Sequence, residues 1–554
     1  MGESMLLEGF TEYNKEEAEK YNKFGWWSGI TFGDMFNKAA GLFPEKEALV
    51  DDNNRLTYSQ LREKVDKLAI SLINVGIKKQ ERVLLQLPNW SEFVYSYFAL
   101  QKIGAIVVLL IPRHSQIEIS HFCHLTGAKM WIVPQKYEQV NYLPIIHNVL
   151  QENSELKNVI LVRGRDDEQF PSLEGLIRDA NLIEDNGRQL VYRRPNPMEV
   201  AHMGPTGGTT GLSKLVPRTH NSEICKIKHL AETCKLSSDD ICLAVAPVGH
   251  SATFTVVVCG AIFACAKLIL LDSASPEDIC KAVEKEKITV AMMPPTLVMK
   301  VVNFEGLKDY DMSSLVKVIG GGATSPRELI QNIHEKIGCK YINAYGATEG
   351  TGCMTRLDYD VDTICNTVGK PTCTYDEYKI IDRDEKELAP NTAGELVVKG
   401  PSIFTGYFNA PEENEKAFAK DGFFKTGDLA IIDNSGDIRI TSRIKDVILR
   451  GRETINPIEI EELIITHPDV EAVSVIGMPD EELGERVCAY IQPVCGAKLS
   501  SEDIISFLKA KAKGASLLQL PERIEFIESI PLTEVGKADK KALRADIKKR
   551  LEMA

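Results

Sequence analysis

The sequence predicts an α/β fold, in which a largely parallel sheet is covered by crossover helices. Between residues 55 and 133, helical and strand patterns alternate, and the apolar run at 105–112 is uninterrupted. An uninterrupted run of this kind indicates a strand that is covered on both faces, as in a parallel sheet. From about residue 443 onwards, short apolar strands and helices instead indicate a compact α+β part.

The individual elements follow from local signals. Thr57 and Gln60 form a capping box, which predicts that a helix begins there. A strand at 83–88, a helix from about 90 to 103 that Gly104 stops, and further strands at 316–319 and 341–344 follow. Residues 434–437 predict a hairpin turn between apolar strands. In the last part, the expected elements are a helix capped by Asn456 with Pro457 at its first position, strands at 470–478 and 486–494, and a helix from about 500.

Length and charge limit the function classes. The chain has 554 residues, of which 44% are hydrophobic and 26% charged, so several globular cores are expected. The formal net charge is -14. Nucleic acid is therefore not an expected partner, because non-specific binding to its phosphates needs a basic surface. Small anionic ligands are still allowed, since local cations can override the global charge.

Three features bear on location and redox state. The acidic N-terminal stretch lacks an apolar core preceded by positive charge, so we expect no secretory signal and a cytoplasmic protein. The 13 cysteines include no C-x-x-C pair, which predicts reduced, mostly buried thiols rather than a disulfide or zinc framework. The apolar run 254–271 contains Thr255 and Lys267, so we expect a buried helix followed by a core strand and no membrane span.

A loop rich in glycine and threonine carries the strongest chemical signal. Residues 206–214 read TGGTTGLSK, and the candidate phosphate-binding residues are Thr206, Gly207, Gly208, Thr209, Thr210 and Lys214. Glycine lets successive backbone amides approach one anion, and the lysine adds a mobile positive charge. The segment is not a Walker A loop, because Ser213 precedes the lysine and Leu215 follows it. A flexible surface loop is the alternative interpretation.

This loop, continuing as LVPRTH over 215–220, resembles the phosphate-binding signature of the adenylate-forming superfamily. That superfamily holds acyl- and aryl-CoA synthetases, adenylation domains of peptide synthetases and luciferases. The resemblance extends from about Thr31 to the C-terminus and is strongest to the aryl-acid (2,3-dihydroxybenzoate) AMP ligase branch. It implies an N-terminal domain, 1–442, of two layered α/β subdomains plus a small β-barrel. A small mobile α+β domain, 443–554, would follow.

The resemblance also implies an acyl pocket. Its candidate residues are His250, Ser251, Phe254, Gly320 and Gly346. His250 is the expected gate, although a lone histidine beside an apolar face is more often a core residue. Ser251 departs from the amide side chain that dihydroxybenzoate-activating members carry. We therefore expect a compact, cyclic or aromatic acid that need not be a catechol.

The nucleotide would be held by two further segments. The resemblance places adenine at Gly321, Gly322 and Ala323, beside the strand residues Asn343 and Ala344. The next turn, YGATEG at 345–350, supplies groups of three kinds. Tyr345 can stack on a base, Thr348 can bond a phosphate oxygen, and Glu349 can ligate Mg²⁺. A capped turn without chemistry is the alternative.

Candidates in the C-terminal third come from the resemblance. Asp428 would accept the ribose hydroxyls, and Arg443 would reach the ribose or a phosphate. Lys445 would be the hinge. Gly451 would keep a slot for a pantetheine arm, and Arg452 would bind CoA phosphate. Surface charge is the alternative for each of these polar side chains.

Lys537 follows the motif PLTEVG at 531–536, where the family places the lysine of the first half-reaction. With Thr348, Glu349 and His250 it completes the expected catalytic set. The predicted activity is an AMP-forming acid–thiol ligase that uses ATP, Mg²⁺ and CoA, and that can also run toward ATP. One alternative is an aryl-acid ligase that loads a carrier protein. An inactive nucleotide-binding regulatory protein and a luciferase-like oxygenase are remoter.

Overall fold

The computed structural model of the chain describes residues 7–164, 169–180, 182, 184–206, 213–323, 325–451, 453–511, 520–533 and 538–552. The chain divides into two compact units. The first comprises Met1–Glu377 and Lys399–Phe418, and the second comprises Tyr378–Val398 and Ala419–Ala554. The predicted domain boundary at 442/443 lies inside the second unit and stays a prediction.

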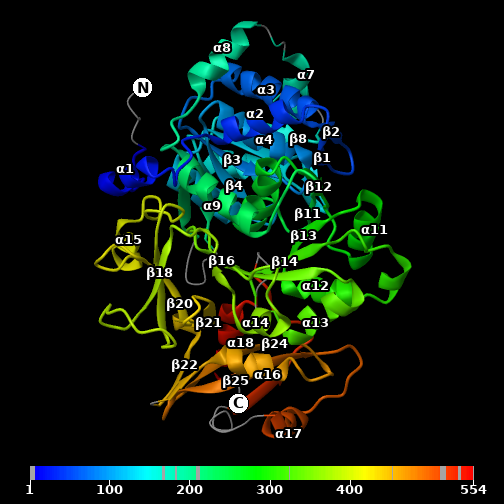
Figure 1. Cartoon of the computed structure of the whole chain (residues 1–554), viewed down its shortest axis with the longest axis vertical. Coiled ribbons are helices and arrows are strands. Elements are labelled where there is room, and N and C mark those ends of the chain that lie inside the picture. The colour runs from blue at the N-terminus through cyan, green and yellow to red at the C-terminus, as the bar shows by residue number, and fades with distance from the viewer. Residues whose placement is uncertain are drawn as a thin grey trace. The chain divides into compact units, whose positions relative to one another are not determined.

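The first unit contains two large sheets (Figure 1). The nine-stranded sheet has the order β17 (Lys370–Pro371), β16 (Gly352–Met354), β15 (Lys340–Gly346), β14 (Lys317–Gly321), β13 (Val290–Met293), β11 (Ile241–Ala244), β12 (Lys267–Leu270), β1 (Glu47–Val50) and β2 (Arg55–Thr57). The six-stranded sheet has the order β10 (Leu215–Thr219), β9 (Val200–Pro205), β4 (Ile106–Leu110), β3 (Arg82–Gln86), β5 (Met130–Pro134) and β8 (Asn158–Val162).

Most neighbouring strands in the two sheets pair in parallel, as the sequence predicts, although β15–β16 and β9–β10 are antiparallel. Pairs β13–β14, β14–β15, β3–β4 and β3–β5 are all parallel. Crossover helices connect them, among which are α4 (Ser91–Lys102), α5 (Gln116–Thr126), α11 (Pro276–Glu286), α12 (Pro295–Val302) and α13 (Arg327–Lys336). Helix α9 (His220–Thr233) instead leads from β10 of one sheet to β11 of the other. Strand β4 is buried along its whole length, which explains its uninterrupted apolar run.

Local signals set the helix boundaries in this unit. Helix α3 (Tyr58–Asn74) begins at the capping box of Thr57 and Gln60, and both of its hydrogen bonds are present. Gly104 follows α4 with a φ of 70°, which favours glycine and ends the helix. These predictions are confirmed.

The apolar run at 254–271 is a buried helical segment followed by a strand, as expected. It comprises the π-helix η1 (Thr253–Cys259), the short helix α10 (Gly260–Phe263) and β12. Lys267 pairs with Glu286 at 2.9 Å, so the charge inside the run is neutralised. Among the described residues, no helix has the length and apolarity needed to cross a membrane.

The second unit contains two smaller sheets. The antiparallel four-stranded sheet has the order β18 (Glu377–Ile381), β19 (Gly394–Lys399), β20 (Phe424–Ile432) and β21 (Ile438–Arg443), in the region where a small barrel is expected. The other sheet has the order β23 (Glu453–Ile455), β22 (Ile448–Arg450), β25 (Gly484–Pro493) and β24 (Val470–Asp480), and β26 (Arg523–Phe526) pairs with β25. Helices α16 (Pro457–Ile464), α17 (Ser501–Lys511) and α18 (Lys540–Glu552) complete the α+β part.

The turns and caps of this unit agree with the sequence. Residues 434–437 join β20 to β21 as an antiparallel hairpin. The Asn456 side chain accepts a hydrogen bond from the Ile458 N–H, and Pro457 occupies the first turn of α16. Each of these signals acts over a few residues and is confirmed.

Candidate functional site

The glycine-rich loop is closed at its base by a β-hairpin. Leu215 of β10 lies opposite Pro205 of β9. The Thr206 N–H donates to the Lys214 carbonyl at 2.8 Å, and the Lys214 N–H donates to Thr206 Oγ1 at 3.3 Å. The hairpin therefore fixes where the loop leaves and re-enters the sheet. Residues 207–212, which include Gly207, Gly208, Thr209 and Thr210, lie outside the described residues.

A tight turn after β15 presents Thr348 and Glu349. The Gly350 N–H donates to the Ala347 carbonyl at 3.1 Å. Gly350 has a φ of 114°, and a Cβ there would collide with the Ser402 carbonyl oxygen. Only glycine fits this position, so the backbone itself fixes the direction of the two polar side chains.

Thr348 lies where three segments meet. A Cβ on Gly204 of β9 would be 2.9 Å from Thr348 Cγ2, so the threonine packs on the strand that leads into the loop. The hydroxyl groups of Thr348 and Ser251 are 3.0 Å apart and share a hydrogen bond. The structure therefore brings a predicted phosphate-binding residue and a predicted acyl-pocket residue into direct contact.

Glu349 is held by a tyrosine that the sequence analysis missed. The Tyr407 hydroxyl donates to Glu349 Oε1 at 2.8 Å. Lys214 Nζ lies 3.9 Å from the centroid of the same ring, in a cation–π contact. Burial and the neighbouring Glu349 raise the pKa of Tyr407 well above its usual value. Nothing in the sequence around Tyr407 marks it, because the two residues are 58 positions apart.

This donor set fits Mg²⁺. Mg²⁺ is commonly bound through one or two carboxylates together with substrate phosphates. Glu349 supplies one carboxylate, and the base of the candidate phosphate loop lies beside its neighbour Thr348.

A buried ionic network supports the turn that carries Thr348 and Glu349. Arg218 of β10 pairs with Glu223 of α9 at 2.7 Å, and both side chains are almost fully buried. Arg218 Nη1 donates to the Glu349 carbonyl at 3.0 Å, and Nη2 donates to the Ser402 carbonyl at 2.5 Å. The Thr255 hydroxyl of η1 donates to the other Glu223 oxygen at 2.6 Å. The network thus joins β10, α9, η1 and the turn.

Lys226 adds a second contact from α9 to the turn. Its ammonium group donates to the Ala347 carbonyl at 3.2 Å. Burial lowers the pKa of Lys226 to about 8, although Glu223 opposes the shift. Arg218, Glu223 and Lys226 are positioning residues that the sequence analysis did not single out. A signal for them does exist in the sequence, because three charged residues stand within nine positions shortly after the glycine-rich loop.

The three acyl-pocket candidates around η1 differ in exposure. His250 and Ser251 are partly exposed just before η1. Phe254 is fully buried, and its ring centroid lies 4.7 Å from that of Tyr97 and 5.1 Å from that of His202. Phe254 therefore packs in an aromatic cluster, and its contact with an acid stays a prediction.

The adenine candidates lie on neighbouring strands. Gly320 pairs with Asn343, and Gly321 pairs with Ala344, in the parallel register of β14 and β15. A Cβ on Gly320 would overlap the Tyr341 hydroxyl, and one on Gly321 would be 2.9 Å from the Ala344 carbonyl oxygen. The two glycines thus allow this close strand packing.

The remaining candidates of this region differ in exposure. Gly322 and Ala323 are exposed, whereas Tyr345 is partly buried and Gly346 is exposed. The buried Asn343 amide nitrogen donates to the carbonyl oxygens of Thr367, at 3.0 Å, and Ile364, at 3.3 Å. Its side chain therefore anchors α14 (Val361–Asn366). The predicted nucleotide contact of Asn343 is untested.

In the second unit, two predicted ribose-binding residues pair with each other. Asp428 of β20 and Arg443 of β21 lie opposite in the register, and Arg443 Nε is 3.2 Å from Asp428 Oδ1. Lys445 follows in the short 3₁₀ turn Ile444–Asp446. Arg544 of α18 donates to Asp446 at 3.0 Å, so the candidate hinge is tied to the C-terminal helix.

Gly451 forms the turn between β22 and β23. It has a φ of 61°, and its N–H donates to the Leu483 carbonyl at 2.7 Å. The positive φ explains the glycine without reference to a ligand. Arg452 and Lys537 lie outside the described residues.

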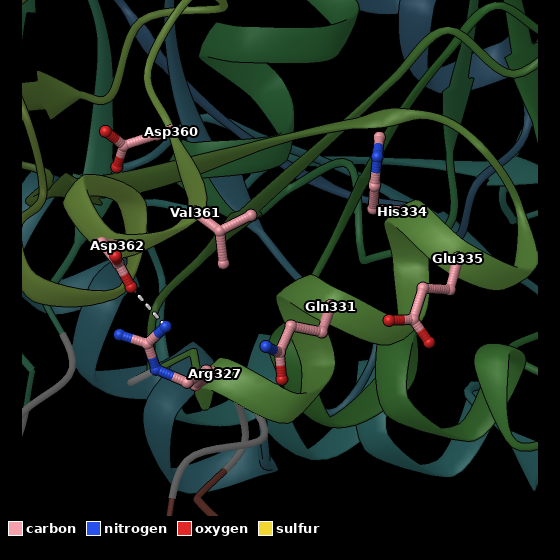
Figure 2. A pocket seen from close by; sticks show the side chains of 7 residues that line it. All are labelled: Arg327, Gln331, His334, Glu335, Asp360, Val361 and Asp362. Atoms are coloured by element: carbon pink, nitrogen blue, oxygen red, sulfur yellow. Dashed lines mark hydrogen bonds and ion pairs between the residues drawn. The ribbon is translucent and has the colours of Figure 1, made fainter.

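A pocket of about 410 Å³ lies between α13 and the start of α14. The described residues that line it are Arg327, Gln331, His334, Glu335, Asp360, Val361 and Asp362. Figure 2 shows Arg327 and Asp362 joined by an ion pair, which measures 2.5 Å. None of these residues is a predicted site residue.

These features are those of an adenylate-forming type of site: two α/β sheets, a loop on a hairpin base, and an adjacent Thr-Glu turn. Comparison with known families agrees, and the chain belongs to the AMP-binding enzyme family: that family's model matches residues 36–408. The model of the AMP-binding enzyme C-terminal domain matches residues 459–537. The predicted superfamily and fold class are thereby confirmed, and the chain is an AMP-forming, acid-activating ligase.

Individual relatives align over nearly the whole chain. The 2,3-dihydroxybenzoate-AMP ligase of Bacillus subtilis is 35% identical, covering 99% of both chains. The 2-hydroxy-7-methoxy-5-methyl-1-naphthoate--CoA ligase of Streptomyces carzinostaticus is 32% identical, covering 97% of both. The salicyl-AMP ligase / salicyl-S-ArCP synthetase of Mycobacterium tuberculosis is 30% identical, covering 97% of this chain and 94% of the relative. The apo structure of Mycobacterium smegmatis MbtA has a TM-score of 0.73 at 30% identity, covering 98% of this chain and 100% of that one.

Proposed function

We propose that the protein adenylates a compact aromatic or cyclic carboxylic acid and transfers the acyl group to the phosphopantetheine thiol of a carrier protein. The observation that carries this proposal is the hydrogen bond between Ser251 and Thr348 beside the base of the glycine-rich loop. It joins a candidate acyl wall to a candidate phosphate site. A carboxylate and the α-phosphorus of ATP must meet at such a junction.

In the first half-reaction, a carboxylate oxygen of the acid attacks the α-phosphorus, and pyrophosphate leaves. Protein groups act here by positioning and by stabilising charge, since no covalent enzyme intermediate is needed. Residues 206–214 would hold the phosphates, and Thr348 would bond an α-phosphate oxygen. Glu349, oriented by Tyr407, would hold Mg²⁺, which supplies charge neutralisation on the phosphates.

The base and sugar of ATP would be held by the remaining candidates. Gly321, Gly322, Ala323 and Tyr345 would border adenine, and Asp428 would accept the ribose hydroxyls. Arg443, which pairs with Asp428 at 3.2 Å, would keep that carboxylate oriented. Both side chains come from adjacent strands of one hairpin, so their spacing is set by β-sheet register.

The acid would lie against His250, Ser251, Gly320 and Gly346. A serine hydroxyl is shorter than an amide side chain, so Ser251 offers less reach toward a ring substituent. Its bond to Thr348 also occupies part of its hydrogen-bonding capacity. We therefore propose benzoate-like or monohydroxylated rings ahead of catechols.

The relatives change which molecule is expected to accept the acyl group. Free CoA was the first expectation, with a carrier protein as the alternative. One relative is a salicyl-AMP ligase / salicyl-S-ArCP synthetase, and this favours the carrier protein. CoA stays as the second candidate because a relative of similar coverage is a CoA ligase.

The two half-reactions would use different arrangements of the C-terminal domain, 443–554. Lys537 would stabilise the developing charge during adenylation. Rotation about Lys445 would then withdraw it and bring Gly451 and Arg452 to the pantetheine arm. Thiolate attack on the mixed anhydride releases AMP.

Acid-dependent exchange of labelled pyrophosphate into ATP tests the first step. The panel should include benzoate, hydroxybenzoates, cyclic alkane and alkene carboxylates, and short fatty acids. Enzyme with preformed adenylate is then offered free CoA or a phosphopantetheinylated aryl carrier protein. Exchange with ring acids and faster transfer to the carrier are expected. Faster transfer to CoA would establish the second candidate, and no exchange with any acid would refute the proposal.

A further inference from the structure

Three buried side chains that are not among the candidate site residues converge on one point. Cys225 and His229 of α9 and Cys373, which follows β17, place their potential ligand atoms within 4.8 Å of one another. The three residues are 2%, 7% and 1% exposed. Cys225 and His229 are four residues apart, so they share one face of the helix. Cys373 is 148 residues further along the chain than Cys225, so the cluster exists only in the folded protein.

The geometry points to a structural site for a thiophilic cation, and we propose Zn²⁺ bound by Cys225, His229 and Cys373. The two sulfur atoms are 4.0 Å apart. Two thiolates on one Zn²⁺ lie about 3.8 Å apart, from Zn–S bonds of about 2.3 Å at a tetrahedral angle. A disulfide would need the same atoms at about 2.05 Å, a much larger movement. The observed spacing therefore suits a shared metal better than a covalent bridge.

The His229 ring is oriented for metal binding by a neighbouring carboxylate. Its Nδ1 lies 3.1 Å from Glu232 Oε2, which fixes the orientation of the ring. Its Nε2 is buried, and the ring also makes a side-chain hydrogen bond with Cys373, so it already faces one of the two thiols. A carboxylate that holds one imidazole nitrogen while the other binds metal is the usual arrangement at zinc sites.

The surroundings favour an ion that no substrate reaches, and because three protein ligands leave one tetrahedral position open, a water molecule would complete the shell. Cys225 and Cys373 share a core cluster with Tyr21 and Trp27, which closes the site to a substrate. Binding would release the thiol protons, and two thiolates would neutralise the dication in this apolar setting. The ion would cross-link α9 to the segment after β17. Because α9 also carries Glu223 and Lys226, the link would secure the helix that supports the Thr348–Glu349 turn.

Metal binding by the full-length chain tests this inference without any activity assay. Chelator-treated protein is titrated with Co²⁺, which reports thiolate ligands by charge-transfer absorption, and with Zn²⁺ in competition. We expect one ion per chain. Cys225→Ser, Cys373→Ser and His229→Gln should each weaken binding by at least about tenfold, and Glu232→Gln by about 10- to 100-fold. Cys234→Ser, another buried thiol next to α9, and Cys495→Ser, an exposed one, should bind as wild type does.

A second measurement uses only the wild-type chain, in case the variants do not fold. X-ray absorption of the Zn²⁺ form should show two sulfur ligands at about 2.3 Å and a nitrogen at about 2.0 Å. Failure to bind Co²⁺ or Zn²⁺, absorption lost only with Cys495→Ser, or a ligand shell without sulfur would each overturn the proposal. None of these results depends on whether the enzyme activates an acid.

Discussion

Tyr407→Phe isolates one hydrogen bond in the candidate site. The substitution removes the hydroxyl that donates to Glu349 Oε1 at 2.8 Å, and it keeps the ring on which Lys214 Nζ rests. A hydrogen bond to a charged group contributes about 1.5–3 kcal/mol. At about 1.4 kcal/mol per factor of ten, its loss predicts a roughly 10- to 150-fold fall in kcat/KM for adenylation.

The assay is pyrophosphate exchange at several Mg²⁺ concentrations. Because the hydroxyl orients a proposed metal ligand, the Mg²⁺ concentration for half-maximal exchange should rise together with the fall in rate. Tyr137→Phe is the matched control, since it removes a hydroxyl that donates to Asp272 at 3.0 Å and touches no predicted site residue. Its exchange should stay near that of wild type. Unchanged rate and Mg²⁺ dependence in Tyr407→Phe, or an equal loss in Tyr137→Phe, would refute the reasoning.

Three further predictions test neighbouring parts of the account. Gly204→Ala should destabilise the fold by about 1–3 kcal/mol and slow pyrophosphate exchange, because the new Cβ would press on Thr348. Gly41→Ala is the control, since no atom lies within 4 Å of its new Cβ. Thermal melting and exchange of this control should match those of wild type. Burial raises the pKa of Asp376 from 3.8 to about 6, against opposing hydrogen bonds from Ser402. Between about pH 4 and 6 the folded state therefore binds more protons than the unfolded state, so this carboxyl stabilises the fold less as the pH rises. The free energy of unfolding of wild type minus that of Asp376→Asn should fall over this range. A flat or rising difference would contradict the prediction. Lys537→Ala should slow adenylate formation roughly 100- to 1000-fold and spare thioester formation from preformed adenylate, and equal loss of both would count against its role.

Much of the fold could be predicted because its signals are local. The capping box of Thr57 and Gln60 and the cap at Asn456 act within one helical turn, and both appear as expected. The apolar run that became β4 and the strands of the C-terminal part have unambiguous patterns. The grouping of β18–β21 with the C-terminal part could not be predicted, since it depends on tertiary packing.

The candidate site was predictable only where residues cluster in sequence. Thr348 and Glu349 stand in a recognisable turn, whereas their support by Arg218 and Tyr407 arises across 131 and 58 positions. Cys225 and Cys373 show the same limit of sequence analysis. The lack of C-x-x-C spacing argued against a zinc site, but the fold brings these two distant cysteines together. Sequence spacing excludes local metal motifs and leaves such assembled clusters undetected.

Pyrophosphate exchange measured with and without each organic acid tests the central claim most directly. The account predicts that labelled pyrophosphate enters ATP only when Mg²⁺ and a ring-bearing carboxylic acid are both present. Exchange that is absent with every acid, or that proceeds equally without one, would contradict it.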